Sequence, residues 1–315
     1  MVALAAAGCN APNPIRSLTD RTPDHLALYH GARPGGTIYV AAGGRIWRIR
    51  GGALDAVTPA DKNYSYPAAS ADGKHTAAAL VSRGHSEIAL GGADFTGLRP
   101  LTTAGPTSDR WALDLKPTFS PDGSRLAFMS DRAAGFSDEQ VWEGPYAPYH
   151  PVQVTCQPDQ TGGDDAPSYL ADGQLLLFTQ WQPQAGAVHG QVSEKRVPFS
   201  CLTQRGLPKV LLQKDGEDFM DAAAGPPGRI AYVHRRSEVS NLEVSADDGS
   251  APLALTTFGD VRQAAWSADG ANLLFISSNA GSFDLWEVAV TGKSPPVRLT
   301  WGANLDATAR PAWIS

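Results

Sequence analysis

The sequence predicts an all-β fold, a six-bladed β-propeller with four-stranded antiparallel blades, from three observations. A strand–turn–strand unit recurs with a period of about 50 residues, which is typical of propeller blades. Glycine (32 of 315 residues) and proline (24) are abundant and only 18% of residues are charged, which suits short strands joined by tight turns. The C-terminus also carries the first strand of a blade whose remaining strands lie near the N-terminus.

The clearest copy of the unit is Pro117–Gly123, PTFSPDG, followed by SRLAFMSDR at 124–132. Asp-Gly supplies the positive-φ positions that a two-residue hairpin turn requires, and apolar residues alternate on both sides of it. One copy is degenerate, at Pro226-Pro227-Gly228. The glycines of the successive turns are Gly73, Gly123, Gly173, Gly228 and Gly270. The unit therefore predicts the first two strands of five successive blades.

Two further patterns recur in phase with these turns. A third strand carries an apolar residue before Trp or Glu, as in Val141-Trp142-Glu143. A fourth strand ends in a Leu/Val-Thr pair in every copy except the one at Leu211-Leu212. Four strands per blade are therefore expected. The complete blades are predicted at 63–105, 113–157, 165–214, 219–258 and 262–302.

The two ends of the chain supply the sixth blade. Arg310–Ser315 has the pattern of a first strand that stops where its Asp-Gly turn would come, whereas Thr37–Val40 behaves as a second strand. We expect one C-terminal strand to join three N-terminal strands, in a blade made of 36–60 and 309–315. Such closure removes the exposed sheet edges of an open array.

A family resemblance follows from these motifs. The segment FSPDGSRLAFMSDR, a third strand such as DLWEV and an exit such as VRLT resemble the propeller repeat of TolB and related bacterial envelope proteins. The resemblance covers residues 36–315 and is specific for the fold, but poorly specific for function. TolB also carries an α/β domain before its propeller, for which the stretch before residue 36 has no room. The resemblance is therefore not expected to extend to TolB's own role.

The N-terminus suggests an export signal. Residues 1–9, MVALAAAGC, resemble the end of a bacterial lipoprotein signal, in which the cysteine is lipidated. The segment lacks basic residues and its apolar run is short, so the alternative is an Ala-rich N-terminus with a chance cysteine. We predict a truncated signal at 1–9, lipidation at Cys9, a tether at 10–35 and the propeller at 36–315. The protein would then lie in the periplasm or at the outer membrane, held only by lipid.

The other two cysteines, Cys156 and Cys201, could form one disulfide in an oxidising compartment or remain two buried thiols. Cys201 falls in an irregular stretch, 181–204, that is longer than an ordinary turn. Such a stretch is either a recognition loop or a tolerated surface insertion.

The sequence offers little for catalysis or for nucleic acid. The net charge of −6 and the absence of a Lys/Arg cluster argue against nucleic acid and anionic membranes as partners. The sequence contains no GxSxG elbow, and its seven histidines and three cysteines show no metal-ligand spacing. These features predict a protein that is not an enzyme.

Acidic residues precede the first strand of most blades. Because first strands line the channel of a propeller, these acids would surround one of its mouths. They could hold a divalent cation or attract a basic peptide, although aspartate is also common in turns for structural reasons. The candidate residues are Asp114, Asp164, Asp165, Asp218, Asp260 and Asp306.

The sequence thus favours a monomeric, non-enzymatic scaffold of the envelope that presents its loops and acidic channel mouth to a protein or peptide partner. No cofactor is expected beyond a divalent cation in the channel. The alternative is a periplasmic metal-dependent hydrolase or lyase with its site at the channel. Glycan binding through the 181–204 stretch and Trp181 is a third hypothesis.

Overall fold

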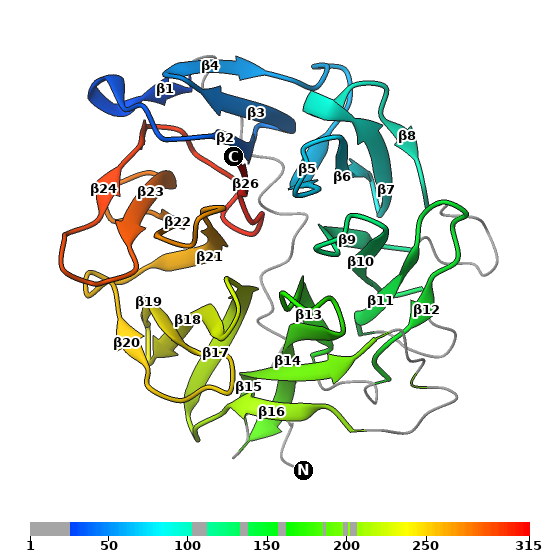
Figure 1. Ribbon diagram of the computed structural model, residues 1–315, viewed down its shortest axis with the longest axis vertical. Helices are drawn as coiled ribbons and strands as arrows, with labels where there is room; N and C mark the ends of the chain where they lie inside the picture. The colour runs from blue at the N-terminus through cyan, green and yellow to red at the C-terminus, as the bar shows by residue number, and fades with distance from the viewer. Residues whose placement is uncertain are drawn as a thin grey trace, which may run out of the picture.

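The computed structural model describes residues 26–102, 112–132, 138–156, 162–184, 187–197, 201 and 207–315. Six four-stranded antiparallel sheets are arranged around a central axis as the blades of a propeller (Figure 1). The predicted fold class is therefore confirmed. Cys9 and most of the predicted tether lie outside the described residues. No helix in the described part of the chain is long and apolar enough to cross a membrane.

The closing blade joins the two ends of the chain in the order β26-β2-β3-β4. Residue Tyr39 pairs with Ala312 and Ile38 pairs with Trp313, so a single C-terminal strand completes three N-terminal ones, as predicted. The strands are β2 (Thr37–Ala42), β3 (Arg45–Arg50), β4 (Ala53–Ala56) and β26 (Ala312–Ile314).

In each of the other five blades the strands follow chain order from the axis outward. The second blade contains β5 (Tyr64–Ala69), β6 (His75–Ser82), β7 (His85–Gly92) and β8 (Arg99–Pro100). The third contains β9 (Asp114–Phe119), β10 (Arg125–Ser130), β11 (Gln140–Pro145) and β12 (Val152–Gln153). The fourth contains β13 (Asp164–Tyr169), β14 (Leu175–Gln184), β15 (Ala187–Arg196) and β16 (Lys209–Leu212). The fifth contains β17 (Glu217–Ala224), β18 (Arg229–Arg236), β19 (Val239–Ala246) and β20 (Leu253–Ala254). The sixth contains β21 (Val261–Trp266), β22 (Asn272–Ser277), β23 (Asp284–Ala289) and β24 (Val297–Arg298).

A small addition fastens the start of the described chain to the sixth blade. Strand β1 (Ala27–Leu28) pairs with β25 (Thr300–Trp301), and the short 3-10 helix η2 (Tyr29–Gly31) follows. The ring of Tyr29 stacks on that of Trp301, with centroids 5.6 Å apart. The last residues of the predicted tether therefore pack on the propeller. A second 3-10 helix, η3 (Ala93–Phe95), lies between β7 and β8.

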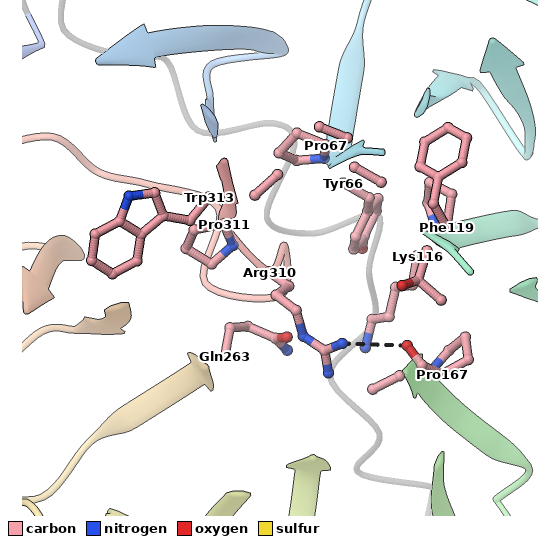
Figure 2. A pocket seen from close by; sticks show the side chains of 15 residues that line it. Tyr66, Pro67, Lys116, Phe119, Pro167, Gln263, Arg310, Pro311 and Trp313 are labelled. Carbon is pink, nitrogen blue, oxygen red and sulfur yellow. Dashed lines mark hydrogen bonds between the residues drawn. The ribbon is translucent and has the colours of Figure 1, made fainter. Parts of the chain in front are cut away.

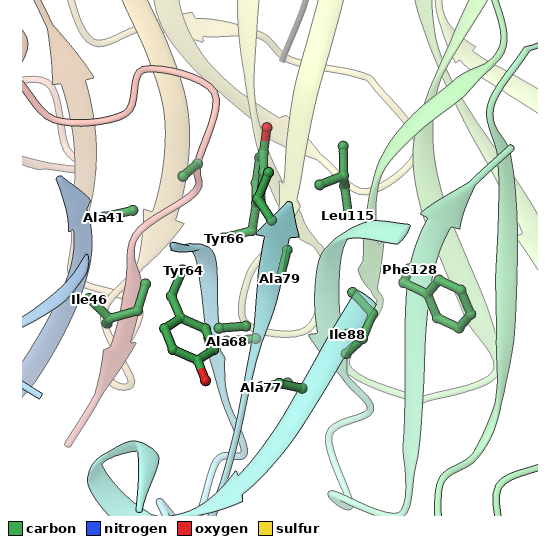
Figure 3. Close-up of a cluster of buried hydrophobic side chains, with 14 of the residues drawn as sticks. Ala41, Ile46, Tyr64, Tyr66, Ala68, Ala77, Ala79, Ile88, Leu115 and Phe128 are labelled. Carbon is green, nitrogen blue, oxygen red and sulfur yellow. The ribbon is translucent and has the colours of Figure 1, made fainter. Parts of the chain in front are cut away.

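The core lies between adjacent blades. Three consecutive alanines of β6, Ala77, Ala78 and Ala79, are completely buried, because their small side chains let neighbouring sheets approach on both faces. Figure 3 shows one such cluster, in which the first three blades meet. Its labelled residues are Ala41, Ile46, Tyr64, Tyr66, Ala68, Ala77, Ala79, Ile88, Leu115 and Phe128.

The recurrent threonine completes the fourth strand of a blade. Its hydroxyl accepts a hydrogen bond from a backbone N–H of the third strand, at 2.9 Å in all five copies. The hydroxyl thus replaces the pairing that a very short fourth strand cannot supply. In the fourth blade Val192 pairs directly with Leu212 across an irregularity of the ladder, which explains why that copy has no threonine. The donor–acceptor pairs are Ile46–Thr58, Ile88–Thr102, Val141–Thr155, Leu242–Thr256 and Leu285–Thr300.

Replacing Thr102 with valine should destabilise the protein by about 1–3 kcal/mol, because the buried N–H of Ile88 loses its acceptor. Urea unfolding measures this difference. The matched control is Thr291→Val at an exposed threonine, which should change stability little. Equal losses in the two variants would show that the motif threonine has no special role.

Candidate binding site at the channel mouth

The first strands surround a central channel, and the described residues line two pockets in it. The larger has a volume of 560 Å³ and is lined by residues that begin the first strands, such as Leu113 and Asp164. The smaller has a volume of 140 Å³ and is lined by residues further along the same strands, such as Phe119 and Trp313. The two pockets therefore lie on opposite sides of a constriction. We call the larger pocket the mouth and the smaller one the turn-side pocket, since the first strands lead from it to the Asp-Gly turns.

The constriction is formed by one equivalent position in each repeat, directly before the first-strand proline or alanine. In five blades this residue has a positive φ, between 46° for Gln263 and 55° for Asp221. The strand pairing shifts register at the same place in each of these blades. Such a bulge removes the residue from the ladder and turns its side chain toward the axis. The six residues are Tyr66, Lys116, Ala166, Asp221, Gln263 and Arg310.

Charges of both signs meet at the constriction. Lys116 donates from Nζ to Asp165 Oδ2 at 2.7 Å, and Gln263 donates from Nε2 to Asp221 Oδ1 at 2.8 Å. Burial acts to lower the pKa of Lys116, but the carboxylates of Asp165 and Asp221 outweigh it and raise that pKa. Arg310 reaches across the channel and donates to the carbonyl oxygens of Ala222 at 2.8 Å and Pro167 at 3.3 Å.

Acidic side chains line the wall of the mouth between β11 and β13. Asp164 is fully buried, and no hydrogen bond of normal geometry reaches its carboxyl oxygens from the described residues. Burial raises the pKa of Asp164 to about 8; the nearby Thr155 hydroxyl and the charge of Lys195 oppose the shift, and the carboxylates of Asp165 and Asp138 add to it. Burial likewise raises the pKa of Glu139 to about 6, again with a contribution from Asp165. At neutral pH Asp164 is therefore mainly protonated, whereas Glu139 is mainly ionised.

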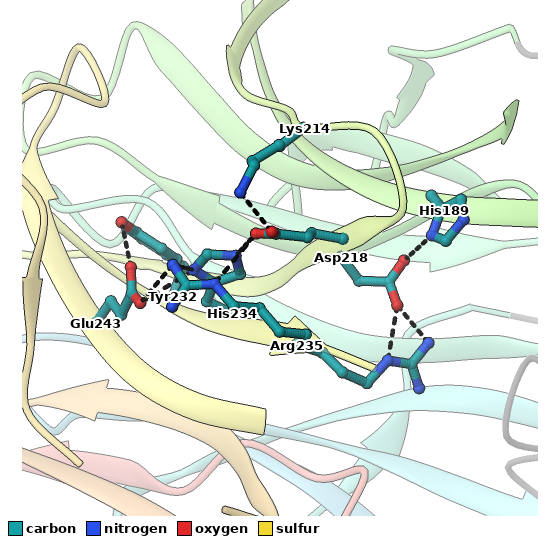
Figure 4. A network of polar contacts seen from close by, with 9 residues as sticks. His189, Lys214, Asp218, Tyr232, His234, Arg235 and Glu243 are labelled. Atoms are coloured by element: carbon teal, nitrogen blue, oxygen red, sulfur yellow. Dashed lines mark hydrogen bonds and ion pairs between the residues drawn. The ribbon is translucent and has the colours of Figure 1, made fainter. Parts of the chain in front are cut away.

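The basic residues of the mouth are matched by acids. Asp218 accepts a hydrogen bond from Arg235 Nε at 2.6 Å and contacts His189 Nδ1 at 2.9 Å (Figure 4). Arg262 lies 3.5 Å from Asp260. Since Lys116 is paired with Asp165, each cation of the mouth has a carboxylate of its own. Glu139 has no cationic partner among the described residues, so it adds uncompensated negative charge.

A polar network extends from this wall into the fifth blade (Figure 4). His234 is buried between two acids, with Nε2 2.6 Å from Glu217 and Nδ1 3.0 Å from Glu243. Lys214 donates to Glu217 at 2.5 Å, and this contact is the largest cause that lowers the pKa of Glu217 to about 2. The network fixes β17 against β18 and so holds Asp218 and Arg235 in place.

The structure brings only Asp164 and Asp165 of the six predicted acids into the mouth. The other four hold neighbouring segments in place or stay near the surface. Asp114 is buried and paired with Arg132, while Asp218 holds Arg235 and the end of the β14–β15 hairpin. Asp306 accepts hydrogen bonds from Ser65 and Thr308, and Asp260 is the most exposed. A role for all six in partner binding stays a prediction, and Asp165, although it lines the mouth, is paired with Lys116.

Sequence analysis missed Lys116, Asp138, Glu139, Gln263 and Arg310. An alignment of the six repeat sequences would have revealed the constriction residues, because each directly precedes the recurrent proline or alanine. The two acids at 138 and 139 carry no such signal. They precede a third strand, and only the packing of the third blade against the fourth brings them to the mouth.

The stretch 181–204, which the sequence predicts to be irregular, begins as the extension of a regular hairpin. Strands β14 and β15 have ten residues each, and their pairing continues to Gln184 and Ala187. Trp181 on this extension lines the mouth. Further along the stretch, Cys201 forms a disulfide with Cys156, which ties it to the exit of the third blade. The hairpin is therefore placed to contact any molecule that enters the mouth.

In the parts of the chain that the structure describes, no group of three or more His, Cys, Asp or Glu side chains is arranged to hold a metal ion.

Comparison with known proteins supports the fold. No protein-family model matches the sequence, and no curated protein matches it. The solved structure of TolB from Acinetobacter baumannii superposes with a TM-score of 0.69 at 18% identity, over 89% of this chain and 67% of that one. The chain has the fold of a TolB-like propeller. A putative TolB from Agrobacterium tumefaciens gives a TM-score of 0.60 at 14% identity, over 88% of this chain and 92% of that one.

Enzymes share the same fold. An oligogalacturonate lyase in complex with manganese superposes with a TM-score of 0.54 at 13% identity, over 90% of this chain and 73% of that one. At such identities the likeness is one of architecture. Function has to be argued from the side chains of the site.

Proposed function

We propose that the chain is a non-catalytic binding protein of the bacterial envelope that takes a cationic segment of a protein or peptide partner at the channel mouth. The observation that carries this proposal is the 560 Å³ mouth, in which Glu139 adds negative charge without a cationic partner among the described residues. Aromatic side chains of Trp181 and Phe283 line the same cavity and could pack on the aliphatic part of a lysine or on the face of an arginine. The likeness to TolB supports a place in the periplasm.

The proposal is tested with a fluorescently labelled peptide of alternating lysine and glycine, whose binding is followed by anisotropy. Binding should weaken as salt is added, because the attraction is electrostatic. It should strengthen between pH 5 and pH 7, because Glu139 loses its proton near pH 6. In Glu139→Gln we expect about tenfold weaker binding at pH 7, which corresponds to about 1.4 kcal/mol, and no pH dependence in this range.

The matched control is Asp72→Asn, which removes the same charge from an Asp-Gly turn at the far end of the first strands. It should bind the peptide as the wild type does. If the two variants lose affinity equally, the attraction reflects net charge and the mouth is not the site.

A periplasmic metal-dependent hydrolase or lyase is the alternative. The specific observation in its favour is that Glu139 and Asp164, with pKa values raised to about 6 and about 8, share one cavity. Carboxyl groups with raised pKa values are typical of general acids and bases. The test is an assay with oligogalacturonate and Mn²⁺. Turnover by the wild type that is lost in Glu139→Gln would support the enzyme and contradict the binding protein.

A further inference from the structure

The turn-side pocket differs in character from the mouth (Figure 2). It has a volume of 140 Å³, and most of the residues that line it are apolar. Lys116, Gln263 and Arg310 stand where it meets the constriction. The wall is formed by Pro67, Pro117, Pro167 and Pro311, together with Phe119, Trp313 and small residues.

Arg310 has more hydrogen-bond donors than the protein satisfies. A guanidinium group has five N–H donors, and the described residues provide two acceptors, the carbonyl oxygens of Pro167 and Ala222. The Nε of Arg310 is buried and has no partner in the ranges that the structure describes. No carboxylate of a described residue lies within ion-pair distance of its guanidinium. The nearby acids are engaged elsewhere, Asp165 by Lys116 and Asp221 by Gln263.

The Arg310 side chain is partly buried with its Nε fully enclosed, and a cation withdrawn from water in this way is costly unless it is paired. Burial lowers the pKa of Arg310, and the more distant carboxylates of Asp221 and Asp165 oppose that shift only in part. Carbonyl dipoles compensate part of the charge, but three N–H donors still have no acceptor in the described part of the chain. A carboxylate is the complementary group, because its two oxygens match the planar fork of a guanidinium.

The walls restrict what can carry that carboxylate. Proline has no backbone N–H, so the four prolines offer no donors to a second negative charge. A singly charged carboxylate needs only the donors that Arg310 leaves free, whereas a doubly charged phosphate would also need Lys116, which is already paired with Asp165. The small volume, together with the prolines, Phe119 and Trp313 of the wall, favours a compact apolar body behind the carboxylate.

We propose that the turn-side pocket binds a carboxylate group on a small apolar body, with the carboxylate paired to the free N–H donors of Arg310. The group could belong to a free organic acid or to the C-terminus of a peptide. This site lies across the constriction from the mouth and does not depend on the function proposed for the mouth.

The test compares sodium 3-methylbutanoate with the neutral 3-methylbutanamide, which has the same shape and no charge. NMR titration should show saturable binding of the acid, with a shift of the Arg310 Nε–H resonance, and at least tenfold weaker binding of the amide. In Arg310→Met the acid should bind at least tenfold more weakly. The matched control, Arg262→Met, removes a cation that lines the mouth instead and should bind the acid as the wild type does.

Two outcomes would overturn the proposal: equal binding of acid and amide to the wild type, or no binding of the acid. Both outcomes are measured on the wild-type protein, so they test the proposal even if Arg310→Met fails to fold. A further arm compares a short peptide ending in leucine as free acid with its C-terminal amide. A peptide acid that binds more tightly than 3-methylbutanoate identifies a peptide C-terminus as the ligand, whereas weaker binding identifies a free acid. Equal binding of peptide acid and peptide amide contradicts recognition of the carboxylate.

Discussion

Replacing Asp164 with asparagine should make the protein more stable than the wild type at pH 8, with the difference disappearing near pH 4. The folded-state pKa of Asp164 is raised to about 8 from an ordinary value of 3.8. In the unfolded chain this group ionises near pH 4, whereas in the folded protein it keeps its proton. The stability that it contributes is therefore fully present below pH 4 and is lost as the pH rises through 8. At about 1.4 kcal/mol per pKa unit, the loss amounts to several kcal/mol.

The asparagine variant has no proton to lose and should escape this decline. Urea unfolding at pH 4, 6 and 8 measures the difference. The control is Asp72→Asn, because hydrogen bonds from Ser70 and Lys74 lower the pKa of Asp72 to about 2. That carboxylate stabilises the fold once ionised, so its removal should not increase stability at pH 8. An Asp164→Asn variant less stable than the wild type at pH 8 would mean that the ionised carboxylate is well accommodated.

Breaking the disulfide between Cys156 and Cys201 should lower the free energy of unfolding by about 4 kcal/mol, as expected for a sequence separation of 45 residues. The bond restricts the unfolded chain and fastens the end of the 181–204 stretch to the third blade. Cys201 is also held by its backbone N–H, which donates to the carbonyl oxygen of Gln153 at 3.1 Å. Urea unfolding with and without a reducing agent measures the loss.

The control for this experiment is the double variant Cys156→Ser/Cys201→Ser, studied in a Cys9→Ser background. It should match the reduced protein and should not respond to the reducing agent. If the oxidised protein and the double variant unfold at the same urea concentration, the disulfide contributes nothing to stability.

The architecture was predictable from the sequence because its signals are local. An Asp-Gly turn and a Leu/Val-Thr pair each solve a hydrogen-bonding problem within one blade, so they recur wherever a blade recurs. The closing strand was predictable for the same reason, since RPAWIS at 310–315 has the pattern of a first strand. The similarity to TolB structures confirms the family resemblance at the level of fold.

The site was harder to predict because it depends on contacts between blades. The sequence predicts aspartates around the channel mouth because they precede the first strands, but it does not show which carboxylates are engaged by neighbouring side chains. Asp114, for example, is paired with Arg132 of its own blade. The constriction depends on a bulge that directs Lys116 to the axis, and strand patterns assume regular alternation. Lipidation at Cys9 stays a prediction, since that residue lies outside the described part of the chain.

Site-specific photo-crosslinking tests binding at the mouth most directly. A photoreactive phenylalanine derivative is placed at position 181, where Trp181 lines the mouth, and in a second protein at position 207, where Leu207 is 94% exposed beside the outer strand β16. Each protein is irradiated in an extract of the native cell envelope. We predict a discrete protein adduct at position 181 that Glu139→Gln diminishes and Asp72→Asn does not, with no such adduct at position 207. An adduct that forms equally at both positions, or one that Glu139→Gln leaves unchanged, would contradict partner binding by the acidic mouth.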